Sequence, residues 1–288
     1  MLNSYLWLLP LGLVIGAFGT LIGAFGTLIG AGGGFILVPA LLLLYPNEKT
    51  ELITGISLAV VFFNAFSGSL AYGRMKRVDY KSGVIFSIAT IPGAILGAIS
   101  TAYVPRRAFD LIFGVLMILG AVFLWLSTKQ DHPTGLSRRE TRDSEAIQSG
   151  WTAREFVDAA GVRYRYAYNP LVGIGLSVFV GFVSSLLGVG GGFIHVPVLT
   201  RLLNFPVHIA TATSQFVLAV MALTGTLVHI ANGVFVSGVR RTLLLALGVV
   251  IGAQFGAALS NRVGGRMIIR GLAVGLTLVG LRLILSEY

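Results

Sequence analysis

The most constraining feature of this chain is a run of eight residues that occurs twice with one substitution, GGGFILVP at 32–39 and GGGFIHVP at 190–197. Each copy lies inside a long apolar stretch. Glycine triplets interrupt helices, because glycine loses more conformational freedom on ordering than any other residue. Within a bilayer, interrupted backbone is tolerated only where it is buried in protein or lines a water-filled cavity. Two equivalent breaks therefore predict a transport site between two repeats.

The composition predicts a membrane protein. Hydrophobic residues make up 55% and charged residues 11% of the 288 positions, whereas soluble domains carry about 25% charged residues. Several apolar runs approach or exceed the roughly 20 residues that cross a bilayer as a helix. We therefore expect an all-α, polytopic helical bundle. The chain has no cysteine, which excludes disulfides, thiolate catalysis and cysteine-based metal sites.

The apolar segments fall into two halves. They are expected at 5–29, 33–45, 52–72, 82–103 and 108–127, and again at 170–188, 191–204, 209–230, 242–260 and 267–286. This pattern predicts a first transmembrane repeat at 1–128, a polar loop at 129–169 and a second transmembrane repeat at 170–288. The end of the loop, RYRYAYN at 163–169, alternates like a strand and allows a short hairpin.

The two halves align beyond the glycines, which indicates an internal duplication. TGIS at 54–57 corresponds to TATS at 211–214, and Gly68 corresponds to Gly225. The segment at 33–45 is too short to span a bilayer easily. We therefore expect a hairpin in which one helix enters, breaks at the glycines and returns as a shorter helix. Each half then crosses the membrane an odd number of times, which inverts the second repeat relative to the first.

The basic loops agree with this inversion. The formal charge of +10 comes mainly from short loops between apolar segments, as the positive-inside rule produces. Inversion places the basic residues at 74–81, the central loop and 262–270 on one side, and those at 106–107 and 240–241 on the other. The first group is more basic, so we expect the central loop in the cytoplasm.

After each break a short helix is expected to begin at Phe35 and at Phe193. The first backbone N–H groups of a helix have no intrahelical partner, and the helix dipole places partial positive charge there. Two such ends near the membrane midplane would form an anion site. The alternative is a tight turn that only allows close helix packing. A nucleotide-binding glycine loop is excluded, because that fingerprint needs a preceding strand and a following acidic residue.

A second group of candidates is polar but uncharged and lies where the next helix of each half begins. Hydroxyl and amide groups can replace part of an anion's hydration shell. The alternative for each of them is a hydrogen bond to a preceding carbonyl of its own helix. The group consists of Thr54, Ser57, Thr211, Thr213, Ser214 and Gln215.

Positions at which the halves differ point to function rather than folding. His195 stands where the first half has Leu37, Gln215 corresponds to Leu58, and Asn64 corresponds to Met221. Ionisable residues within a membrane segment are costly and are functional candidates. Because histidine titrates near neutral pH, His195 is the candidate proton carrier, and a neutral histidine bonded to a carbonyl is the alternative.

The predicted substrate-binding residues are Gly32, Gly33, Gly34, Phe35, Thr54, Ser57, Gly190, Gly191, Gly192, Phe193, Thr213, Ser214 and Gln215. We expect no catalytic residue, no metal site and no cofactor, because neither a base–nucleophile pair nor a metal-ligand cluster occurs.

The repeated motif resembles the sulfite exporter TauE/SafE family, also called TSUP or DUF81-type permeases. That family has G-x-GGGF-x-x-VP in both halves, followed by a TS pair, and this chain has GAGGGFILVP and GVGGGFIHVP with TGIS and TATSQF. The resemblance implies a permease of small sulfur-containing anions in a bacterial or archaeal plasma membrane. The first half departs from the pattern at Gly55 and Ile56, and the heptad GAFGTLI occurs twice at 16–29.

Our leading hypothesis is a secondary transporter that exports sulfite, thiosulfate or an organosulfonate by alternating access around a midplane site. One alternative is an uncoupled anion channel or facilitator. Another is a membrane partner that delivers a sulfur species to a soluble enzyme through the central loop. Nucleic acid is not an expected partner, whereas a homo-oligomer stays open.

Overall fold

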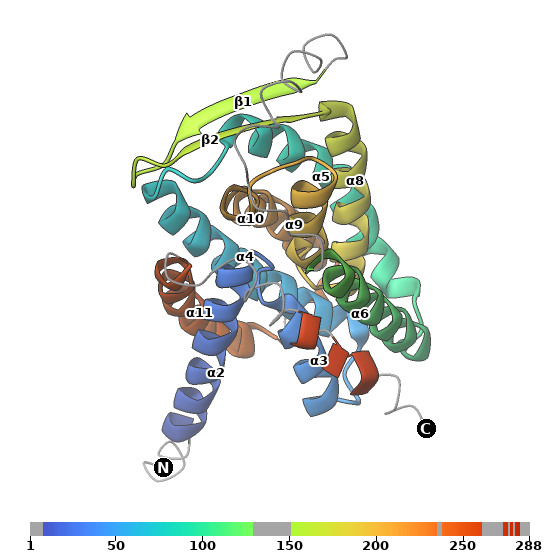
Figure 1. Ribbon diagram of the computed structural model, residues 1–288. Coiled ribbons are helices and arrows are strands. Elements are labelled where there is room, and N and C mark those ends of the chain that lie inside the picture. The colour runs from blue at the N-terminus through green and yellow to red at the C-terminus, as the bar shows by residue number, and fades with distance from the viewer. Residues whose placement is uncertain are drawn as a thin grey trace.

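The computed structural model describes residues 8–128, 151–234, 238–260, 273–275, 277–278 and 280–282 (Figure 1). Its elements are α2 (Leu8–Ile29), α3 (Gly34–Leu44), α4 (Thr50–Arg74), α5 (Tyr80–Ser100), η1 (Thr101–Tyr103), α6 (Arg106–Thr128), β1 (Thr152–Val157), β2 (Arg163–Tyr168), α8 (Pro170–Leu187), α9 (Gly192–Arg201), α10 (Val207–Ala231) and α11 (Val239–Leu259). The predicted segment at 267–286 lies mostly outside the described residues, and the basic residues at 262–270 lie wholly outside them.

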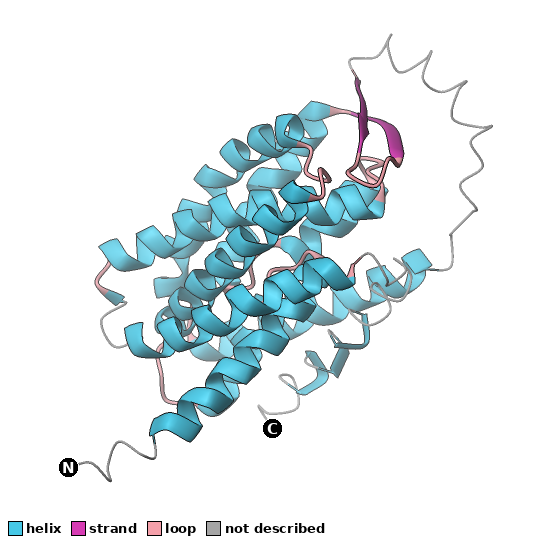
Figure 2. Cartoon of the chain, turned by 90° about the vertical axis from the view of Figure 1, so that its left-hand side faces the viewer, coloured by secondary structure: helices cyan, strands magenta, loops and turns pink. Residues whose placement is uncertain are grey.

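The all-α membrane fold is confirmed. Most of the described chain is helical (Figure 2). Within the described residues, five helices are long and apolar enough to cross a bilayer, and the chain is an integral, multi-pass membrane protein. They cover Thr50–Arg74, Tyr80–Tyr103, Pro170–Leu187, Val207–Ala231 and Val239–Leu259.

Both predicted helix breaks are present. α2 and α8 are each followed by a glycine in the left-handed region of backbone conformation. These residues are Gly30, with φ 80°, and Gly188, with φ 69°. Glycine adopts positive φ at little cost because it has no Cβ. The short helices α3 and α9 begin at Gly34 and Gly192, one residue earlier than predicted.

The chain reverses at each break. A Cβ added to Gly33 would meet the Ile22 side chain at 2.6 Å, and one added to Gly191 would meet Ser184 Oγ at 2.6 Å. Residues after the break therefore pack back onto the helix that leads into it. This arrangement is the hairpin that the short segments predicted.

Two long helix pairs pack through glycines at corresponding positions. α11 lies along α2, where Gly252 faces the Thr20 carbonyl, and α5 lies along α8, where Gly93 faces the Val178 carbonyl. Small residues let helix backbones approach closely in membranes. α4 and α10 also pack against each other.

The polar stretch before α8 contains a hairpin outside the helices. β1 pairs antiparallel with β2, with Arg154 opposite Tyr166. The stretch at 163–169 that alternates in sequence is thus largely a strand, as predicted. Figure 1 shows the hairpin across one end of the helical bundle.

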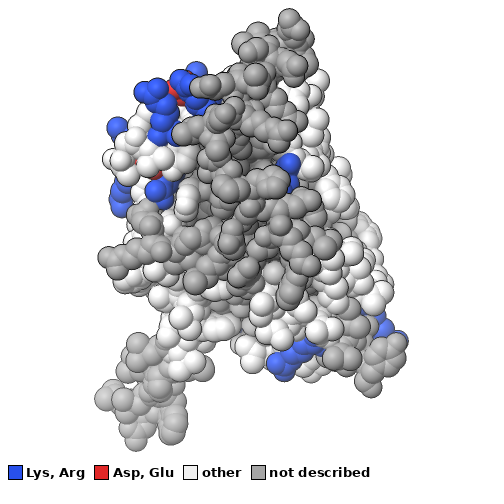
Figure 3. All heavy atoms as spheres, in the orientation of Figure 1, with Lys and Arg blue, Asp and Glu red and all other residues white. Residues whose placement is uncertain are grey.

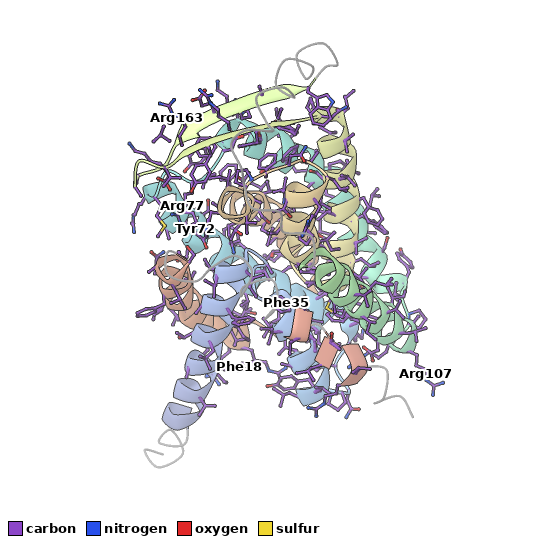
Figure 4. All side chains as sticks on the ribbon, viewed as in Figure 1. Phe18, Phe35, Tyr72, Arg77, Arg107 and Arg163 are labelled. Carbon is purple, nitrogen blue, oxygen red and sulfur yellow. The ribbon has the colours of Figure 1, made fainter. Side chains whose placement is uncertain are left out.

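Figure 3 shows that charged residues of the described chain gather mainly at two ends of the molecule, and that the described surface between them belongs mostly to residues without a charge. Arg77 and Arg163 lie at the hairpin end and Arg107 lies at the opposite end (Figure 4). At that opposite end, Arg106 Nη1 donates to the Glu48 carbonyl and Arg241 pairs with the Glu48 carboxylate at 3.1 Å. The basic loops at 74–81 and at 106–107 thus lie at different ends, and the inversion of the repeats and the cytoplasmic assignment stay predictions.

Candidate transport site at the glycine breaks

The two breaks lie against each other in the middle of the bundle. A Cβ added to Gly34 would collide with the Val189 carbonyl oxygen, and one added to Gly192 would collide with the Gly30 carbonyl and the Ala31 Cα. Corresponding residues of the two halves therefore make corresponding contacts. Side chains at either glycine would force the breaks apart.

Serine hydroxyls tie each break to the other half. Ser57 Oγ donates to the Gly188 carbonyl at 2.6 Å, and Ser214 Oγ donates to the Gly30 carbonyl at 3.2 Å. These carbonyls belong to the ends of α8 and α2, where intrahelical partners are missing. Two predicted site residues thus satisfy the broken backbone in reciprocal fashion.

Thr54 and Thr213, two threonines of this group, form hydrogen bonds that do not join the two breaks. Thr54 Oγ1 donates to the Thr50 and Glu51 carbonyls of its own helix, which is the alternative weighed from the sequence. Thr213 Oγ1 accepts from the Asp79 backbone N–H at 3.1 Å, at the start of α5. Of the two, Thr54 contacts a break, because its Cα lies against Gly188. Thr213 instead contacts Asp79, toward the hairpin end.

Amide side chains form a separate polar cluster, which we call the amide cluster: Thr27, Asn64, Gly68 and Gln215. Gln215 Nε2 donates to the Gly26 carbonyl at 3.2 Å, and Thr27 Oγ1 donates to Asn64 Oδ1 at 3.0 Å. A Cβ at Gly68 would lie 3.1 Å from Thr27 Oγ1 and 3.4 Å from Gln215 Cδ. Both amides are fully buried.

Two atoms of the amide cluster have no hydrogen-bond partner among the described residues, Asn64 Nδ2 and Gln215 Oε1. Such atoms cost free energy when they are buried and unpaired. The corresponding positions in the other half are Leu58, Ser185 and Met221. This set of polar residues therefore has no full counterpart at the corresponding positions of the other half. In the sequence, Asn64 was indicated only by its mismatch with Met221.

The remaining predicted residues fall into three groups. Gly32 and Gly190 face the aliphatic side chains of Leu218 and Val61. Phe35 and Phe193 are buried in one shared hydrophobic cluster, where Figure 4 shows Phe35 among the helices. Gly33 and Gly191 pack within their own hairpins, as described above.

His195 is buried on α9, and its Nδ1 has no partner within the described part of the chain. Its ring lies edge-on to Phe86, with centroids 6.1 Å apart. His195 Nδ1 is thus not bonded to a backbone carbonyl of the described chain, which was the alternative weighed from the sequence. No group of three metal-ligating His, Cys, Asp or Glu side chains occurs in the described ranges.

The helix starts bear directly on the predicted anion site. No side chain caps α3 or α9, and the Gly192 N–H already donates to the Gly190 carbonyl. The orphan donors expected of helix N-termini are therefore those of Gly34, Phe35 and Phe193. In this structure carbonyl oxygens of the opposite break pack against Gly34 and Gly192. Because carbonyl oxygens repel an anion, an anion would reach both helix starts only after the breaks move apart.

The hairpin end is held by a group that we call the hairpin anchor: Asp79, Ser82, Arg154, Tyr166 and Tyr168. The Asp79 carboxylate pairs with Arg154 and accepts from Ser82 Oγ at 2.5 Å and from Tyr166 Oη at 2.7 Å. Burial alone would raise the pKa of Asp79, but these hydrogen bonds outweigh it and hold the pKa below its ordinary value. Sequence inspection missed this anchor.

Comparison with known proteins adds independent findings. The family model described as sulfite exporter TauE/SafE matches residues 14–283. The "Probable membrane transporter protein YunE" of Bacillus subtilis is 34% identical, with 98% of this chain and 97% of that protein covered. A "Probable membrane transporter protein" of Methanocaldococcus jannaschii is 23% identical, with the same coverage of 98% and 97%. No solved structure matches the chain significantly.

Proposed function

Because this chain belongs to the sulfite exporter TauE/SafE family, we propose that it exports a small sulfur-containing oxyanion such as sulfite, thiosulfate or an organosulfonate. The chain is a membrane transporter for a small anion and not an enzyme. The observation that supports this proposal is the reciprocal contact between the two glycine breaks, in which Gly34 packs on Val189 and Gly192 packs on Gly30.

The proposed mechanism is alternating access between two inverted repeats. The recurring contacts at corresponding positions support the repeat, and the opposed hairpins support the inversion. When the breaks separate, the N–H groups at the starts of α3 and α9 become available to an anion. The serine bonds from Ser57 and Ser214 then break or rearrange, since each joins one half to the other.

His195 remains our candidate proton carrier. It is buried next to the break at Gly192, and Nδ1 lacks a partner among the described residues. A proton taken up there would be neutralised by an anion in the adjacent site. This role implies that a pH gradient drives uptake in the wild-type protein and not in a His195→Gln variant.

Uptake into proteoliposomes that hold the full chain tests the function. We expect saturable uptake of at least one of sulfite, thiosulfate and a short organosulfonate, and much slower uptake of sulfate. Protein-free liposomes give the background. A flux that rises linearly with concentration for every anion would contradict a carrier and favour a channel.

The site itself is tested with Ser214→Ala. Loss of this buried cross-half hydrogen bond leaves the Gly30 carbonyl unpaired, at a cost of about 1–3 kcal/mol, and should lower the uptake rate about tenfold or more. Ser177→Ala is the matched control, because Ser177 is equally buried but donates only to Gly173 of its own helix. Equal uptake by both variants would remove Ser214 from the site.

A further inference from the structure

We propose that the amide cluster selects a singly protonated oxyanion, one that carries an O–H donor as well as oxygen acceptors. This inference rests on the proposed function and assigns the chemical form of the substrate at one side of the site. It also adds Thr27 and Asn64 to the substrate-binding residues. Two observations support the inference. Asn64 Nδ2 and Gln215 Oε1 are unpaired among the described residues, and the hydrogen bonds of the other amide atoms, Gln215 Nε2 and Asn64 Oδ1, have a defined direction.

The free atom of Gln215 is an acceptor. The Gly26 carbonyl can only accept, so the 3.2 Å bond to it fixes Gln215 Nε2 as the donor. Oε1 is left without a partner among the residues that the structure describes. A ligand oxygen that bears no hydrogen would be repelled by this carbonyl oxygen. A ligand O–H would instead donate to it.

The free atom of Asn64 has the opposite character. Thr27 Oγ1 donates to Asn64 Oδ1 at 3.0 Å, which leaves the Nδ2 group as a donor with no partner in the described chain. Nδ2 can donate to an oxygen that carries the ligand's negative charge. One donor and one acceptor, both fully buried, thus match an oxyanion that has one O⁻ and one O–H.

The surroundings favour neutral polar recognition over a fixed charge. Gly68 lets Thr27 and Gln215 pack closely against α4, because a Cβ there would lie only 2.9 Å from Thr27 Cγ2. Tyr72 is a titratable side chain that contacts this cluster, and its hydroxyl already donates to the Thr27 carbonyl at 3.0 Å. His195 packs against Phe86 instead. The proton of the ligand is therefore the donor that the cluster lacks.

The asymmetry between the halves supports a role in recognition. Leu58, the residue that corresponds to Gln215, is apolar, and so is Met221, the residue that corresponds to Asn64. A polar pair needed only for helix packing would not be required on one side alone. The burial of two unpaired polar atoms is costly for folding, which a bound ligand would offset.

The test uses two competitors of the same shape and charge in the proteoliposome assay. At a pH where methylphosphonate carries a single charge, it has one O–H, whereas methanesulfonate has none. We expect methylphosphonate to inhibit labelled sulfite uptake at a concentration about tenfold lower than methanesulfonate, the effect of one hydrogen bond. Equal inhibition by the two competitors would overturn the proposal.

Variants test whether Gln215 and Asn64 cause the preference for methylphosphonate over methanesulfonate. Gln215→Leu and Asn64→Met introduce the residues of the other half, and Gln215→Leu should bring the ratio between the two competitors close to one. Gln254→Leu is the control, because Gln254 donates to Ser67 between α11 and α4 and not to a member of the cluster, and should keep the ratio. A ratio that survives in Gln215→Leu would also overturn the proposal.

No uptake of sulfite, thiosulfate or the organosulfonate by the wild-type protein would contradict the proposed function. Normal uptake without a preference between the competitors would contradict only the amide-cluster proposal. If Gln215→Leu does not fold, the wild-type ratio still decides.

Discussion

Gly192→Ala is expected to abolish transport and to destabilise the protein. The added Cβ would collide with the Gly30 carbonyl and the Ala31 Cα, and backbone atoms cannot rotate away as a flexible side chain can. Overpacking of a filled interior costs about 1–3 kcal/mol and occasionally more, and we expect the upper end here. Uptake into proteoliposomes and thermal unfolding in detergent measure the two effects.

A glycine in open space provides the control. Nothing lies within 4 Å of a Cβ added to Gly175 of α8. Gly175→Ala should therefore keep full uptake, and alanine's higher helix propensity favours the helix by about 1 kcal/mol. Wild-type uptake in Gly192→Ala would show that the breaks do not need the close contact seen here.

Asp79→Ala should release the hairpin from the helices. The change leaves the Arg154 guanidinium without its carboxylate and removes the acceptor of Tyr166. Breaking a buried ion pair from one side costs about 3–5 kcal/mol, and about half of that is expected here because Arg154 keeps 19% exposure. Proteolysis within residues 151–169 should become at least tenfold faster.

Glu155→Ala is the matched control for the hairpin. Glu155 pairs with Arg163 and Arg165 on the outer face, where all three side chains are about half exposed. Exposed pairs contribute about 0–1 kcal/mol, so proteolysis should stay close to the wild-type rate. Equal rates for Asp79→Ala and wild type would show that the anchor does not hold the hairpin.

The anchor also has a defined pH dependence. The pKa of Asp79 is lower in the folded protein than its ordinary value, which is about 3.9 for an unfolded chain. Its contribution is therefore complete above that ordinary value and is lost as the pH falls through the lower, folded pKa. Proteolysis of the hairpin should not change between about pH 5 and 8.

Much of the fold was predictable because the decisive signals are local. Apolar length identifies membrane helices, and positive φ at Gly30 and Gly188 follows from glycine chemistry. The helix starts at Gly34 and Gly192 were therefore placed within one residue. The strand at 163–168 was indicated by its alternation.

Side-chain partners were not predictable, because they depend on how distant helices are rotated against each other. Thr213 looked equivalent to its neighbours in TATS, yet it faces Asp79 and not the breaks. The anchor joins Asp79 to Arg154, which are far apart in sequence. No local pattern encodes such a pair, and the same holds for Gln215 and Gly26.

Counterflow tests the central claim, alternating access of a sulfur oxyanion, most directly. Proteoliposomes loaded with unlabelled sulfite would be diluted into trace labelled sulfite, with the membrane potential clamped at zero. A carrier that exposes its site to one side at a time predicts transient accumulation of label above its equilibrium level, lost in Gly192→Ala. Label that rises to equilibrium without an overshoot in the wild-type protein would contradict the account and indicate a channel.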